Sequence, residues 1–156
     1  MRVTQKTIAF PTTQTCYCSG NVDNSLNPAA FADVTGMSFA VKAAVVYHFE
    51  FNILWQSAAA TTGGAFSVNG PASPTFLEYC LVGQTTANAF QSKTGTAYDT
   101  ITAMSTGPGA TTMLAKLVGT IQPSVDGTLI LRSKSELDSS AVTVRKGSCG
   151  ILRIVG

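Results

Sequence analysis

An alternating run over residues 45–56 constrains the fold more than any other feature of this sequence. Large apolar residues occupy every second position, and His48, Glu50 and Asn52 fall between them. Because successive side chains of a strand point to opposite faces of a sheet, this pattern predicts a long strand with one face in the core. The expected core-facing residues are Tyr47, Phe49, Phe51, Ile53 and Trp55.

The rest of the chain also favours strands over helices. Glycine, proline, asparagine and aspartate separate short runs rich in threonine and valine, and only residues 133–139 are mildly helical. Many short strands joined by turns are typical of a sandwich, so we expect an all-β, jelly-roll-like β-sandwich. The further expected strands are residues 65–69, 75–82, 97–104, 113–122, 127–134, 141–145 and 149–155.

The first thirty residues differ from the rest of the chain. Their alternation is weak, Pro11 interrupts it, and residues 19–28 form a polar stretch rich in asparagine, glycine and proline. We expect residues 1–30 to be an extended N-terminal arm that leaves the body, and residues 31–156 to form one β domain. Such an arm has too few apolar residues to fold alone, so its apolar residues are candidate contacts with a partner: Val3, Ile8, Phe10 and Tyr17.

The low charge of the chain predicts association with other proteins. Charged residues make up 12% of the sequence, whereas about a quarter is usual in soluble domains. The alternative is a surface covered by threonine, serine, asparagine and glutamine. The net charge of +2 and the scattered basic residues argue against a nucleic-acid partner. No apolar run approaches the roughly 20 residues of a membrane helix, and the N-terminus lacks the apolar core of a signal peptide.

The cysteines allow two interpretations. Cys16 and Cys18 would share one face of an extended segment, and Cys80, Cys149 or His48 could complete a metal site with them. Free cysteines are more often small buried apolar residues, and this spacing is not that of a zinc finger. We therefore expect reduced, buried thiols, with no metal and no cofactor.

The sequence also gives no sign of catalysis. His48 is the single histidine, and no nucleophile elbow, phosphate-binding loop or dinucleotide motif is present. The carboxylates are dispersed, although Glu136 and Asp138 could in principle contact a calcium ion. We expect a protein that is not an enzyme and has no catalytic residues.

Turns and strand ends of a recognisable kind occur in residues 32–39, 57–64, 68–75, 119–129, 135–136 and 141–148. They resemble those of a family of phage and prophage virion structural proteins, over roughly residues 31–154, which implies a compact β domain attached to a phage particle. The segment with the pattern Gly-Ser-x-x-x-Leu-Arg-Ile near the C-terminus is also similar to the trimeric jelly roll of the tumour-necrosis-factor and C1q type, which implies a homotrimer.

This resemblance implies a capsid decoration (cement) protein that binds the lattice of the major capsid protein and stabilises the head. We expect it on the capsid surface of the virion, after synthesis in the bacterial host cytoplasm, with itself and other virion proteins as partners and neither nucleic acid nor membrane among them. The alternative is a tail- or fibre-associated receptor-binding or adaptor module. That alternative predicts exposed aromatic residues on loops, where Phe90 is the main aromatic residue.

Overall fold

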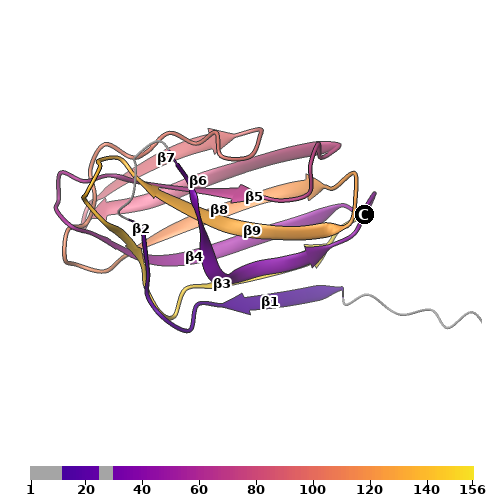
Figure 1. The fold of residues 1–156 in the computed structure, drawn as a ribbon, viewed down its shortest axis with the longest axis horizontal. Helices are drawn as coiled ribbons and strands as arrows, with labels where there is room; N and C mark the ends of the chain where they lie inside the picture. Colours follow the sequence, from indigo (N-terminus) through magenta and orange to yellow (C-terminus); the bar gives the residue numbers. More distant parts are fainter. Residues whose placement is uncertain (1–11, 25–29) are drawn as a thin grey trace, which may run out of the picture.

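The computed structural model describes residues 12–24 and 30–156, which form an all-β, jelly-roll-like sandwich of two antiparallel sheets (Figure 1). This confirms the fold class expected from the sequence. In chain order the strands are β1 (Thr13–Tyr17), β2 (Val22–Asn24), β3 (Ala32–Val41), β4 (Tyr47–Ser57), β5 (Gly64–Asn69), β6 (Phe76–Thr86), β7 (Ala89–Gly95), β8 (Met113–Gln122), β9 (Gly127–Ser135), β10 (Val142–Val144) and β11 (Cys149–Ile154).

The two sheets differ in size. The larger, which we call the large sheet, has the strand order β1-β11-β4-β8-β6-β7, and β10 joins it by pairing with both β4 and β2. The small sheet has the order β3-β9-β5. The core lies between the two sheets, so each sheet has one inner face packed against the other and one outer face.

Strand β4 forms as the alternation predicts. Its burial alternates along its whole length, and Tyr47, Phe49, Phe51, Ile53 and Trp55 are all completely buried. Rings from the small sheet meet this row, because the ring of Phe39 lies 5.2 Å from that of Phe51 and the ring of Phe66 lies 5.4 Å from that of Trp55. Each such side chain contributes roughly 1.5–3 kcal/mol by leaving water.

The strand expected over residues 97–104 is not formed. The strand that follows β6 in the structure is β7, which ends before this segment begins. The apolar residues Ile101 and Met104 of this segment are buried, although the segment is not a strand. It connects β7 to β8, and it contacts β5 by a hydrogen bond from Met104 N–H to the Gly64 carbonyl (2.9 Å). The mildly helical stretch at 133–139 is also not a helix, since β9 continues to Ser135 and a turn follows.

The expected boundary at residue 30 does not separate an arm from the body. β1 pairs with β11, from Thr13 opposite Arg153 to Tyr17 opposite Cys149, and β2 pairs with β10. An edge strand needs backbone hydrogen bonds on one side only, so a polar segment with few apolar residues still joins the sheet. Val3, Ile8 and Phe10 lie outside the described residues, and their role as contacts stays a prediction.

A glutamine side chain of β1 links the large sheet to the small sheet. The Gln14 side-chain amide donates to the Ala40 carbonyl (2.7 Å), and its oxygen accepts from the Ala40 N–H (3.1 Å). Gln14 therefore occupies both backbone groups of one residue of β3, which is itself an edge strand. The contact links the two sheets and satisfies part of an exposed edge.

Candidate interaction surface

The outer face of the large sheet is the most extensive candidate surface. Among the described residues, the small sheet packs against the inner face of the large sheet, and the alternate residues of β4, β6 and β8 that point outward are partly or fully exposed. Residues opposite each other in an antiparallel pair lie on the same face. The strand register therefore shows which side chains are neighbours on this face.

Four apolar side chains gather at one corner of this face, and we call them the apolar corner. Leu54 of β4 lies opposite Leu114 of β8. Val82 of β6 is diagonal to Leu114, and Phe90 of β7 is diagonal to Val82. Leu114, Val82 and Phe90 are 46%, 41% and 65% exposed. Scattered single apolar residues are normal on a surface, whereas a contiguous group indicates an interaction site.

The centre of the face is electrically almost neutral. Lys116 Nζ lies 3.0 Å from the Glu50 carboxylate, which also accepts a hydrogen bond from the Asn52 side-chain amide at 2.9 Å. The bond from Asn52 and the contact with Lys116 lower the pKa of Glu50 below its usual value. The pair thus presents little net charge, which reduces the cost of covering the face with another protein.

Loops at the corner's end of the sandwich are tied to one another by backbone hydrogen bonds. Ser57 N–H donates to the Gly109 carbonyl (3.1 Å), and Gly107 N–H donates to Ala60 (3.1 Å). Ala58 N–H donates to the Ala141 carbonyl at 2.8 Å. These loops consist mostly of alanine, glycine, serine and threonine, so a partner that contacts them would immobilise few long side chains.

Of the contact residues expected from the sequence, the structure places only Tyr17. It is 52% exposed and lies opposite Cys149 on the outer face of the large sheet, so it belongs to this surface and not to a detached arm. The sequence interpretation missed the apolar corner. Its signal was present at Leu54 and Leu114, where an apolar residue occupies a position that its strand otherwise gives to polar or exposed residues.

The cysteines occupy three kinds of environment. Cys18 is buried, Cys16 and Cys80 are intermediate, and Cys149 is exposed, so the expectation of buried thiols is wrong for Cys149. Burial, with a smaller contribution from Cys149, raises the pKa of Cys16 to about 12. Within the described ranges, no group of three or more histidine, cysteine, aspartate and glutamate side chains is placed to hold a metal ion. In the same residues, no helix is long and apolar enough to cross a membrane.

Comparison with known proteins gives similarity at the level of fold only. No family model and no curated protein matches this sequence. Among solved structures, TmCBM61 in complex with beta-1,4-galactotriose has a TM-score of 0.40 at 13% identity, over 86% of this chain and 88% of that one. Eiger TNF from S. frugiperda has a TM-score of 0.39 at 9% identity, over 92% of each chain.

A viral structure is more distant. Infectious bursal disease virus Gx strain has a TM-score of 0.24 at 10% identity, and the match covers 92% of this chain but 37% of the viral one. The similarity to viral capsid and jelly-roll proteins is therefore weak. It carries no argument about function, which has to come from the surface described above.

Proposed function

We propose that this chain is a structural protein of a virus particle, a bacteriophage capsid decoration protein that binds the lattice of the major capsid protein as a homotrimer. The observation that carries the proposal is the outer face of the large sheet, which no other sheet of the described residues covers, with its neutral centre and its apolar corner. A sheet face that is rich in uncharged side chains and ends in an apolar group suits a broad protein contact.

The proposal also explains the composition. A stable protein–protein contact covers about 800 Å² on each partner, which is far more than four side chains expose. The corner would then be the part of the contact that excludes water, surrounded by hydroxyl and amide side chains. Several copies in one oligomer would bind the lattice together, so that a modest affinity per copy still gives durable attachment.

The exposed aromatic residues favour the sheet face over the loops as the contact. Tyr17, Phe76 and Phe90 are the aromatic side chains with more than a third of their surface exposed among the described residues. All three belong to strands of the large sheet, in β1, β6 and β7. A receptor-binding module of a tail or fibre would instead be expected to carry such residues at its loop tips, so we propose the head as the attachment site.

A charge placed in the apolar corner tests this proposal. Leu114→Glu puts a carboxylate where the contact must exclude water, so binding to heads that lack the native protein should weaken at least about tenfold. Heads purified after deletion of the gene for this chain would be incubated with the purified full-length variant, and the bound fraction measured by co-sedimentation.

Val125→Glu is the matched control. Val125 is 52% exposed, and it lies in the turn between β8 and β9, at the opposite end of the sandwich from the apolar corner. It should bind like the unmodified chain. Equal binding by Leu114→Glu and the unmodified chain would show that the outer face of the large sheet does not contact the head.

A further inference from the structure

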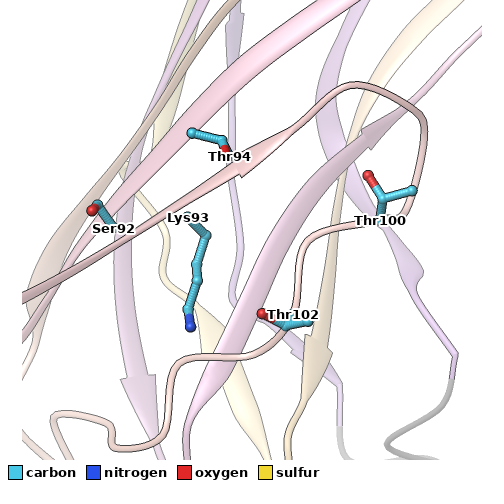
Figure 2. Close-up of a pocket in the computed structure, with 5 residues that line it drawn as sticks. All are labelled: Ser92, Lys93, Thr94, Thr100 and Thr102. Atoms are coloured by element: carbon cyan, nitrogen blue, oxygen red, sulfur yellow. The ribbon is translucent and has the colours of Figure 1, made fainter.

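The free edge of β7 is an unoccupied place for another strand. β7 is the last strand of the large sheet, and β6 is its only strand partner in the described part of the chain. An edge strand presents a row of backbone N–H and C=O groups without strand partners. A groove of about 430 Å³ runs beside this edge, lined by Ser92, Lys93 and Thr94 on one side and by Thr100 and Thr102 on the other (Figure 2).

The opposite wall of the groove belongs to the irregular segment that connects β7 to β8, whose Ser105 N–H donates to the Gln91 side-chain oxygen of β7 (3.1 Å). Along residues 100–104, Ile101 and Met104 are buried while Thr100 and Thr102 are exposed. No strand in the described ranges pairs with this segment. The groove therefore lies between the free edge of β7 and a segment that is in neither sheet.

Two side chains on the outer face of β6 and β7, Phe90 and Glu78, are available to a partner near this edge. Phe90 is 65% exposed, and on this face it is followed by Ser92 and Thr94. Glu78 of β6 forms no ion pair with a described residue, and it shares a shallow hollow with Thr94 and Thr96. An added strand with an apolar residue near Phe90 and a basic residue near Glu78 would satisfy both.

We propose that residues 1–10 of a second copy of this chain add to the free edge of β7 as an antiparallel strand. This segment contains Val3, Ile8 and Phe10 together with Arg2 and Lys6. Pro11 separates it from β1, because proline has no N–H to donate to a ladder. The inference names a contact for the self-association in the proposed function, and it does not depend on binding to a capsid.

The strand order requires the segment to come from another copy. β1 and β7 lie at opposite edges of the large sheet, five strand spacings or about 24 Å apart. An extended chain covers about 3.3–3.6 Å per residue, so crossing this distance would use about seven of residues 1–11. Too few residues would remain to pair with β7 of the same copy, whereas a neighbouring copy can bring its β1 edge close.

An antiparallel register matches the side chains. With Ile8 opposite Phe90, Lys6 lies opposite Ser92 and Arg2 lies opposite Thr96. The basic residues then share the outer face with Glu78, and uncharged Gln5 and Thr7 share the inner face with Lys93. A parallel strand with the same apolar pair would carry the basic residues away from Glu78.

This contact joins the β1 edge of one copy to the β7 edge of the next. Such a head-to-tail contact uses two different surfaces, and it produces a closed ring when the rotation between copies closes. A ring would satisfy every β7 edge, which removes a site of uncontrolled edge-to-edge pairing.

Charge reversal and restoration test the proposal on the full-length chain. Sedimentation velocity should show an oligomer for the unmodified protein. Glu78→Lys alone, and Arg2→Glu alone, should each raise the dissociation constant of the oligomer about tenfold. Combining both substitutions should restore association, because opposite charges again face each other in the row that contains Thr96. A synthetic peptide of residues 1–11 should compete with the oligomer and bind Glu78→Lys more weakly than the unmodified chain.

Phe90→Ser adds an apolar test, with Phe76→Ser as its matched control on the outer face of β6. The first should dissociate the oligomer, and the second should not. A monomer in the unmodified protein, or an oligomer that is insensitive to all of these changes, would overturn the proposal. Head binding is measured separately, so failure here is distinguishable from failure of the proposed function.

Discussion

Phe51→Ala should lower the free energy of unfolding by about 3–5 kcal/mol, because it leaves a cavity in the centre of the core. Phe51 is completely buried, and its ring lies 5.2 Å from that of Phe39 on the facing sheet and 6.1 Å from that of Phe49. Few neighbours can collapse into the space, since both adjacent strands of β4 are fixed by long ladders. Urea unfolding followed by tryptophan fluorescence would measure the change.

His48→Ala is the control in the same strand. His48 points to the outer face of β4, so its loss should change the free energy of unfolding by no more than about 0.5 kcal/mol. A larger loss for the histidine variant than for Phe51→Ala would mean that the register of β4 is inverted.

Gly119→Ala should destabilise the protein by about 2–3 kcal/mol, because no space exists for the added methyl group. A Cβ at this position would lie 2.5 Å from both the Glu78 carbonyl oxygen and the Tyr79 Cβ, and 2.6 Å from the Phe49 ring. Gly119 is on the inner face of β8 between β4 and β6, so the strand cannot shift without disturbing two ladders.

The control is Gly20→Ala, where an added Cβ meets no atom within 4 Å. Its melting temperature should remain close to that of the unmodified chain, whereas that of Gly119→Ala should fall by several degrees. Equal melting temperatures would show that the rings beside Gly119 move freely, which is incompatible with a tightly packed interior at this point.

The strongly alternating strands could be predicted from the sequence, and the edges could not. β4 is buried on one face and exposed on the other, so its pattern is complete in the residues themselves. β7 has Phe90 on its exposed face and Lys93 on its inner face, because an edge strand is held by its neighbour's backbone and not by a core-facing row. β1 was not predicted as a strand because it too is an edge strand held by the backbone of its neighbour.

The glycines within strands were also beyond what alternation predicts. Gly119 and Gly150 occupy inner positions of β8 and β11, and aromatic rings from β4 and from β3 of the facing sheet lie where their side chains would be. A Cβ on Gly150 would lie 2.8 Å from the Phe51 ring and 2.9 Å from the Phe39 ring. Such pairs are set by three-dimensional packing between strands that are distant in sequence.

Composition predicted association, but not the surface that would carry it. A low charged fraction indicates that part of the protein surface is covered by a partner, but it does not indicate which part. Locating the apolar corner required the register that brings Leu54, Leu114, Val82 and Phe90 together from four strands. The division between arm and body at residue 30 failed because β1 and β2 are held by backbone pairing, which apolar content does not reveal.

The most direct measurement is the amount of this chain in purified virus particles. Virus particles produced from the genome that carries this gene would be separated into heads and tails. The amount of this chain in each fraction would then be measured by mass spectrometry relative to the major capsid protein. A capsid decoration protein should be found in the head fraction, in a fixed ratio to the major capsid protein that matches the lattice. Absence from the particles, or a few copies confined to the tail fraction, would contradict the proposed function.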